Sequence, residues 1–227
     1  KEFFHRFILG TYELMDRITS AFPHILFESC AGGGGRFDPG MLYYMPQTWA
    51  SDNTDPIERL TIQFGTSMCY PASSMGAHVS ACDRTGIETK AAVAMAGTFG
   101  YELDITKIPE EERRMIPEQT NMYHKYHDLV REGDYYRIAS YSQNKLYDCY
   151  MVAAKDASEA LVTFVQVRGV PNSKSRKIKL QGLDAKASYR LEGTDQVYTG
   201  EMLMKGGFFI KDMWGDAISR LYHFVRE

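Results

Sequence analysis

Residues 27–55, with the sequence FESCAGGGGRFDPGMLYYMPQTWASDNTD, contain the side chains best suited to chemistry. They combine a cysteine, four consecutive glycines, an arginine and a tryptophan with the carboxylates of Glu28, Asp38, Asp52 and Asp55. A core-forming segment would be richer in Leu, Ile and Val. Glycines allow a ligand to approach backbone N–H groups closely, and carboxylates beside aromatic rings suit a polar ligand. No Gly-Lys-Ser/Thr follows the glycines, which argues against a phosphate loop. The stretch therefore predicts a site for a polar ligand held against backbone N–H groups.

The elements around this stretch alternate between predicted helices and short predicted strands. Apolar residues at helical spacing predict a helix over 3–22 with one buried face, ended by Pro23. Asp38 and Asp55 each precede a proline, as an N-cap precedes the first helical residue, and predict helix starts at Pro39 and Pro56. Two more helices are predicted over 87–96 and 109–131. Strands are predicted over 25–27, 48–51, 77–81 and 98–105, the first as a buried parallel strand.

Repeated strand–helix units predict parallel strands, in either a (β/α) barrel or a doubly wound sheet. The polar residues that follow the strands would then gather at the carboxyl edge of the sheet, where barrel enzymes carry their chemistry. About four strands in 132 residues are too few for a complete eight-stranded barrel. The first part is therefore expected to be a smaller α/β fold or part of a barrel.

The pattern changes after residue 132. Short β-rich segments separated by turn residues predict an antiparallel β-sandwich over 133–227. The strands are expected over 135–141, 147–153, 160–168, 176–180, 188–192, 208–210 and 219–225. We place the domain boundary near residue 133, with an α/β domain over 1–132 and the sandwich over 133–227.

Composition excludes several function classes. The 227 residues carry a net charge of −3 without a basic stripe, which argues against nucleic-acid binding. No apolar run has membrane-spanning length. The four cysteines form no C-x-x-C pair, and His124 and His127 have no evident third ligand, so we expect neither a metal nor a cofactor. Cysteines without a disulfide pattern favour a reducing, cytoplasmic compartment.

Residues 27–55 closely resemble the signature of bacterial α-galactosidases of glycoside hydrolase family 36. The segments HRFILGTYELMDRITSAFPHILFESC, PIERLTIQFGTS, YPASSMGAHVSA and GTFGYELD resemble the same family, and the resemblance covers nearly the whole chain. It implies a (β/α)8 barrel followed by a C-terminal β-sandwich, tetrameric assembly, and hydrolysis of terminal α-galactosides such as melibiose and raffinose with retention at the anomeric carbon. It also implies that Asp52, the first Asp of the S-D-N-T-D motif, is the general acid/base, and that Cys30 and Gly32 contact galactose.

The nucleophile of the family lies in a K-W-D-M-N-R-type motif, which this chain does not contain. Its two tryptophans, Trp49 and Trp214, are not followed by Asp-Met-Asn. The resemblance thus implies that this chain is the second half of the catalytic barrel plus the sandwich. We expect the chain to be inactive without the remaining N-terminal part of the enzyme. An α-N-acetylgalactosaminidase, a transglycosidase and a non-catalytic carbohydrate-binding or assembly unit are the alternatives.

Individual residues also have structural alternatives. Asp52 could be a strand-end carboxylate that caps the following helix, although Asp55 suits that cap better. Trp49 could stack on the sugar or belong to the core. Arg36 could contact the ligand or pair with Glu28 to shape the glycine loop. His78, at the end of the next predicted strand, is assigned neither a structural nor a functional role.

Overall fold

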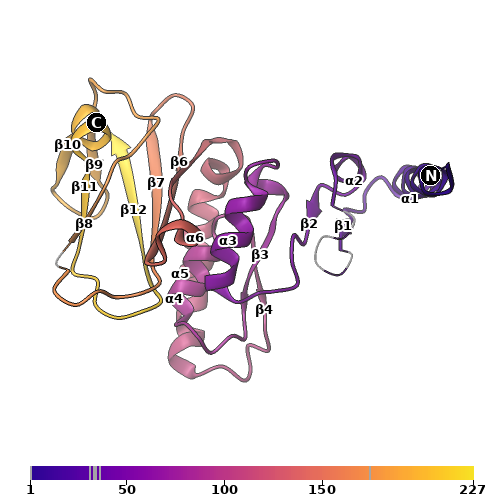
Figure 1. Ribbon diagram of the computed structural model, residues 1–227, viewed down its shortest axis with the longest axis horizontal. Helices are drawn as coiled ribbons and strands as arrows, with labels where there is room; N and C mark the ends of the chain where they lie inside the picture. Colours follow the sequence, from indigo (N-terminus) through magenta and orange to yellow (C-terminus); the bar gives the residue numbers. More distant parts are fainter. Residues whose placement is uncertain (1, 31, 33–34, 36, 174) are drawn as a thin grey trace.

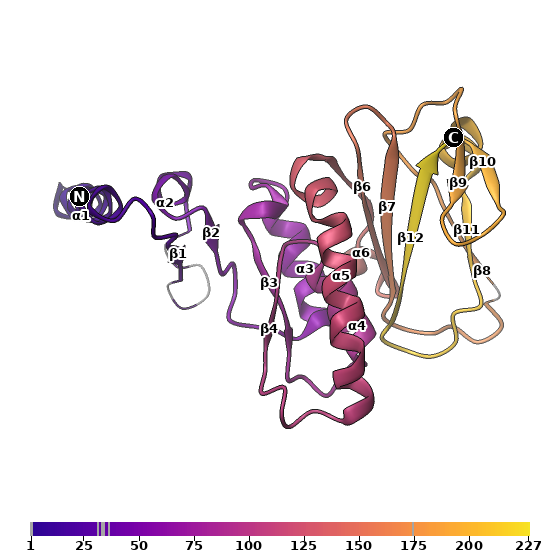
Figure 2. The ribbon, with the colours of Figure 1, turned by 180° about the vertical axis from the view of Figure 1, so that it is seen from behind.

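The computed structural model describes residues 2–30, 32, 35, 37–173 and 175–227. It is elongated, with the N-terminal helix at one end and an antiparallel β-structure at the other (Figures 1 and 2). None of the helices in the described part of the chain is both long and apolar enough to cross a lipid bilayer.

The first part alternates helices and parallel strands. Its helices are α1 (Glu2–Ala21), α2 (Pro39–Tyr44), α3 (Pro56–Thr66), α4 (Ile87–Ala94) and α5 (Glu110–Glu132). Its strands are β1 (Glu28–Ser29), β2 (Gln47–Thr48), β3 (Gly76–Ser80) and β4 (Thr98–Glu102). Strand β1 pairs with β2 and β3 with β4, both in parallel, and a parallel bridge between Thr48 and Met75 joins the two pairs. The four strands therefore lie side by side in chain order.

Helix starts are set by local chemistry, as predicted. Asp38 accepts a hydrogen bond from the backbone N–H of Met41 at 2.8 Å and caps α2. Asp55 accepts from the N–H groups of Ile57 (2.8 Å) and Glu58 (3.3 Å) and caps α3. Each aspartate precedes a proline at the first helical position, whose missing N–H costs nothing there.

The predicted buried face of the N-terminal helix is wrong for the described chain, because no residue of α1 is buried. Phe3 and Phe4 are each 72% exposed, and Phe7 is 60% exposed. Among the named elements, α1 has its main contact with α2, where Tyr12 donates a hydrogen bond to Asp38 at 2.8 Å. The helix has the amphipathic pattern that was expected, but the described residues cover its apolar side only in part, leaving Met15 and Ile18 half-buried.

The first two strands are also shorter than predicted. Residues 25–27 lie outside β1, and Leu26 is 89% exposed rather than buried. Strand β2 ends at Thr48, so most of the predicted strand over 48–51 is an irregular segment. A strand persists where a neighbouring strand and a covering helix stabilise it, and β1 has β2 alone on one side.

The second part is built from two antiparallel sheets. Six strands pair in the order β10-β9-β12-β7-β6-β5, and β8 pairs with β11 in a separate sheet. The bounds are β5 Asp134–Ala139, β6 Tyr147–Ala153, β7 Glu159–Gln166, β8 Ser175–Ile178, β9 Ser188–Leu191, β10 Val197–Thr199, β11 Phe208–Lys211 and β12 Ile218–Arg226. A short helix, α6 (Tyr141–Asn144), replaces the end of the predicted strand over 135–141, and β10 was not predicted. Phe164, Tyr189 and Phe224 are fully buried in the core between the two sheets.

Helices α3, α4 and α5 separate the parallel strands from the six-stranded sheet (Figures 1 and 2). On one side, Ala77 and Val79 of β3 pack with Ile87 and Ala91 of α4. On the other side, Ile57 and Leu60 of α3 pack with Tyr150 and Val165 of the six-stranded sheet. The opposite face of β3 and β4 is covered by none of the helices in the described part of the chain. Successive side chains of a strand alternate between its two faces, so the residues next to Ala77 and Val79 point to this uncovered face. Gly76, His78 and Ser80 of β3 lie on this uncovered face, together with Gly100 and Glu102 of β4.

Candidate active site

The candidate site lies where β1 and β2 end. Ser29 pairs with Thr48 in the parallel register, so Cys30 and Trp49 leave the sheet next to each other at its carboxyl edge. The Trp49 N–H donates to the Ser29 carbonyl at 3.1 Å, which keeps the two segments together beyond the strands. Cys30 is exposed, and Gly32 adopts the left-handed backbone at φ 59° that favours glycine. The prediction for Arg36, including its pairing with Glu28, falls on a residue outside the described ranges.

Asp52 lies on the loop between β2 and α3 and is exposed. Two side-chain turns shape this loop, since the Asn53 N–H donates to Ser51 Oγ and the Asp55 N–H donates to Asn53 Oδ1, each at 3.1 Å. Ser80 Oγ, at the end of β3, donates to the Thr54 carbonyl at 3.0 Å. Asp55 caps α3, so Asp52 does not have the capping role that was considered for it.

Asp55 is additionally held by side chains that follow β3. Arg84 forms ion pairs with Asp55 (3.4 Å) and Glu58 (3.1 Å), and Cys82 Sγ lies 3.4 Å from Asp55 Oδ2. The backbone N–H groups of Ile57 and Glu58, together with Cys82 and Arg84, hold the pKa of Asp55 below its ordinary value despite partial burial. Asp55 is thus an ionised structural carboxylate, whereas the Asp52 side chain stays accessible to a ligand.

Trp49 lies on the uncovered face of the sheet rather than in the core. Its ring meets the His78 ring edge-on, with 4.6 Å between centroids, and passes so close to Gly76 that a Cβ there would come within 3.3 Å of it. His78 Nδ1 lies 4.0 Å from Glu102 Oε2. Burial lowers the pKa of His78, and the charge of Glu102 opposes that shift. Trp49, His78 and Glu102 therefore form a partly polar layer next to the Asp52 loop.

Arg59, on the first turns of α3, belongs to this layer and escaped the sequence analysis. Its guanidinium lies over the Trp49 ring, 5.6 Å from the centroid, and contacts the carbonyls of Ser51 and Gly76. The available signal was an arginine between Ile57 and Leu60, two residues of the buried helix face.

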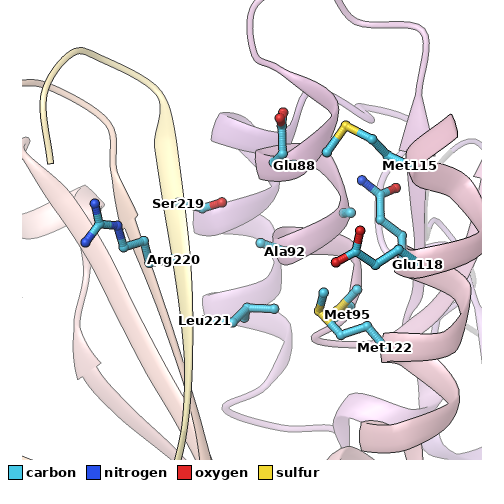
Figure 3. A pocket seen from close by; sticks show the side chains of 11 residues that line it. Glu88, Ala92, Met95, Met115, Glu118, Met122, Ser219, Arg220 and Leu221 are labelled. Carbon is cyan, nitrogen blue, oxygen red and sulfur yellow. The ribbon is translucent and has the colours of Figure 1, made fainter. Parts of the chain in front are cut away.

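Two cavities lie elsewhere in the described part of the chain. One, of about 560 Å³, lies between α1, β1 and α2 and is lined in part by Cys30, Glu28 and Met41. The other, of about 310 Å³, lies between α4, α5 and β12, with Met95, Met115 and Met122 on its wall and Glu88 and Glu118 among its polar residues (Figure 3). Neither cavity has Asp52 among its described lining residues, and the second contains none of the predicted site residues. The described residues thus contribute one side of a site around Asp52, without enclosing it.

Comparison with known proteins identifies the family. Residues 1–133 match the family model described as Melibiase, and residues 147–224 match the model described as Glycosyl hydrolase family 36 C-terminal domain. The chain belongs to glycoside hydrolase family 36. Two family 36 relatives are α-galactosidase AgaA from Geobacillus stearothermophilus, at 48% identity, and α-galactosidase Mel36A from Lactobacillus acidophilus, at 43%. Each alignment covers 98% of this chain but 31% of the relative, so the chain spans about a third of the length of these curated relatives.

Solved structures of family 36 enzymes have the same fold over this region. A crystal structure of α-galactosidase AgaB from Geobacillus stearothermophilus superposes with a TM-score of 0.94 at 48% identity, covering 98% of this chain and 31% of that one. A variant of AgaA in complex with raffinose gives a TM-score of 0.94 at 47% identity, covering 98% and 32%. Another AgaA variant was solved in complex with stachyose. At these identities, family 36 accounts for both the α/β part and the antiparallel part of the chain.

Proposed function

We propose that residues 1–227 are the C-terminal part of a retaining α-galactosidase. Residues 1–132 would supply half of a (β/α)8 barrel, and residues 133–227 the antiparallel sandwich behind it. Four parallel strands side by side in chain order support a barrel over a doubly wound sheet, in which the strand order reverses at a switch point. The family 36 relatives named as α-galactosidases support the activity.

The observation that carries the proposal is the placement of Asp52. It is exposed at the carboxyl edge of the parallel strands, where barrel enzymes bind substrate, and beside the segments that follow β1 and β2. Asp52 would protonate the glycosidic oxygen as the C–O bond breaks and would later take a proton from water. The nucleophile, a carboxylate within about 5–5.5 Å of Asp52, would come from a segment outside residues 1–227.

The galactose contacts would come from the neighbouring loop ends. Cys30 and Gly32 follow β1, and Trp49 follows β2, so these three would lie on the Asp52 side of the sheet. Arg36 stays a sequence-based candidate for a galactose contact. The left-handed backbone at Gly32 supports close approach of a sugar hydroxyl to the main chain. Raffinose and stachyose bound to the AgaA variants support α-galactoside oligosaccharides as substrates. A cytoplasmic enzyme assembled as a homotetramer completes the proposal.

The first experiment compares two aspartates of the same loop in the full-length enzyme that carries this chain. Asp52→Asn removes the proposed acid/base, while Asp55→Asn keeps the oxygen that caps α3. We expect Asp52→Asn to lower kcat/KM for raffinose by a factor on the order of 1,000, and Asp55→Asn to lower it less than tenfold. Equal activities of wild type and Asp52→Asn would refute the proposed role.

A second experiment tests the division of the active site. Residues 1–227 alone should not hydrolyse an aryl α-galactoside, whereas the full-length enzyme should, releasing α-galactose first as retention requires. Turnover by residues 1–227 alone that disappears on Asp52→Asn would contradict an external nucleophile. Rates on α-galactosides and α-N-acetylgalactosaminides of the same alcohol separate the two activities within the family.

A further inference from the structure

Arg59 is a buried arginine at the base of the loop that carries Asp52. The residue is 3% exposed. Its Nε donates to Gln63 Oε1 at 3.1 Å, one terminal nitrogen donates to the Ser51 carbonyl at 3.4 Å, and the other donates to the Gly76 carbonyl. Ser51 directly precedes Asp52 in the chain, so this side chain holds the backbone one residue from the proposed acid/base.

The same guanidinium orients a second residue of the site. Its Cζ lies over the Trp49 ring, 5.6 Å from the centroid, and the same ring makes an edge-on contact with His78 and passes close to Gly76. Gln63, which accepts from Arg59, donates in turn to the Val93 carbonyl of α4 at 3.1 Å. Arg59 thus connects two helices with both ends of the segment from Trp49 to Ser51.

A buried charge needs a reason, because burial penalises the charged form. No described carboxylate lies within ion-pairing distance of Arg59. Burial lowers the pKa of the guanidinium to about 10, although the charge of Glu102 opposes the shift. An apolar side chain of similar volume would avoid this penalty. The geometry therefore favours a function that requires planar donors pointing at the Ser51 and Gly76 carbonyls.

We propose that Arg59 is a positioning residue for the acid/base step, which rests on the function proposed above for Asp52. By fixing the Ser51 carbonyl and the Trp49 ring, it keeps the Asp52 carboxyl aimed at the glycosidic oxygen. In that step the C–O bond electrons pass to the leaving oxygen, which receives the Asp52 proton, while the nucleophile supplies the electron pair to the anomeric carbon. A misplacement of about 1 Å at such a group costs on the order of 100-fold in rate.

The experiment uses the leaving group as the readout, in the full-length enzyme that carries this chain. A sugar leaving group, as in raffinose, requires protonation, whereas a nitrophenolate leaves with little assistance. We expect Arg59→Met to lower kcat/KM for raffinose by about 100-fold and for a nitrophenyl α-galactoside by less than about tenfold. Arg59→Lys keeps the charge but cannot span both carbonyls, so it should recover part of the raffinose activity.

Arg137 provides a matched control at the other end of α3. It donates from Nε to Ser67 Oγ at 2.9 Å and also to the Ser67 carbonyl, and it lies over the Tyr135 ring at 5.5 Å. Arg137→Met therefore removes the same kinds of contact away from Asp52. Its loss of activity, if any, should be equal for raffinose and the nitrophenyl substrate.

The outcomes separate this proposal from the proposed function. A proportional loss on both substrates for Arg59→Met, or no loss, overturns the positioning role. If Arg59→Met does not fold, Arg59→Lys decides, and equal losses on the two substrates count against the role. Asp52→Asn is measured on the same pair. If Asp52→Asn loses more activity on raffinose than on the nitrophenyl substrate but the Arg59 variants do not, only the positioning role of Arg59 is overturned. If Asp52→Asn loses equal activity on the two substrates, the acid/base role of Asp52 and the positioning role of Arg59 are both overturned.

Discussion

Asp148 makes the stability of the protein depend on pH in a direction unusual for an aspartate. It lies on β6, is 2% exposed and accepts a hydrogen bond from the Tyr141 N–H at 2.9 Å. Burial raises its pKa from 3.8 to about 7, and the hydrogen bond from Tyr141 opposes only part of this shift. In the unfolded chain the carboxyl ionises near pH 4. Between these two values the folded protein holds a proton that the unfolded chain has lost, so stability falls as pH rises.

The size of the effect follows from the shift. A rise from 3.8 to about 7 corresponds to about 4 kcal/mol in total, of which about 2.5 kcal/mol is lost between pH 5 and pH 8. Asp148→Asn keeps an oxygen for the Tyr141 N–H but cannot ionise. It adds amide N–H donors at a constant cost of about 1–3 kcal/mol if they stay unpaired. That cost is the same at both pH values and cancels when the two are compared.

Denaturant unfolding at pH 5 and pH 8, followed by far-UV circular dichroism, measures this difference. The free energy of unfolding of Asp148→Asn, relative to wild type, should rise by about 2.5 kcal/mol from pH 5 to pH 8. Asp195→Asn, at an exposed position between β9 and β10, controls for the loss of one negative charge in the same part of the chain. A relative stability of Asp148→Asn that does not change with pH would refute the reasoning.

Two further predictions concern surface contacts. Asp55→Ala should lower the free energy of unfolding by about 1 kcal/mol because α3 loses its N-cap, whereas Asp55→Asn should lose less; equal melting temperatures for wild type and Asp55→Ala would contradict the cap. The pKa of Glu192 is lowered from 4.5 to about 2, first by Lys125 and then by His223. The contribution of the ionised Glu192 to the free energy of unfolding is therefore complete above pH 4.5 and is lost as pH falls towards 2. For this partly exposed carboxylate we expect Glu192→Gln to cost about 1 kcal/mol at pH 7 and to flatten the acid side of the stability profile; an unchanged acid profile would contradict this.

Contacts between residues close in the sequence, such as helix caps, could be predicted from the sequence. Which surfaces of a helix or strand are covered by other parts of the fold could not. The caps at Asp38 and Asp55 were predicted because each aspartate directly precedes the proline that begins the helix. The spacing of apolar residues over α1 correctly predicted a helix. The prediction that one face of it is buried was wrong, because a periodic pattern does not say which surface will cover that face. The predicted lengths of β1 and β2 were wrong for the same reason, because a strand ends where its neighbours stop supporting it.

The candidate site shows the same division. Asp52 and Cys30 were proposed from the family motif, and parallel pairing of β1 with β2 brings their segments to one edge of the sheet. Arg59 was missed because its role depends on Trp49 and Gly76, which reach it from separate parts of the chain. An arginine between two buried helix residues was the only sign in the sequence, and its meaning depends on tertiary contacts.

The place of β12 in the six-stranded sheet has a consequence for biosynthesis. This strand pairs with β7 on one side and β9 on the other, and both precede it in the chain. While the ribosome is still making the segment before β12, β7 and β9 each have an open edge that could pair with a neighbouring nascent chain. The strand also contacts α4, so it completes the packing of the sheet on the helices that β6 and β7 begin. Premature termination just before Ile218 should therefore yield a product that depends on chaperones or aggregates.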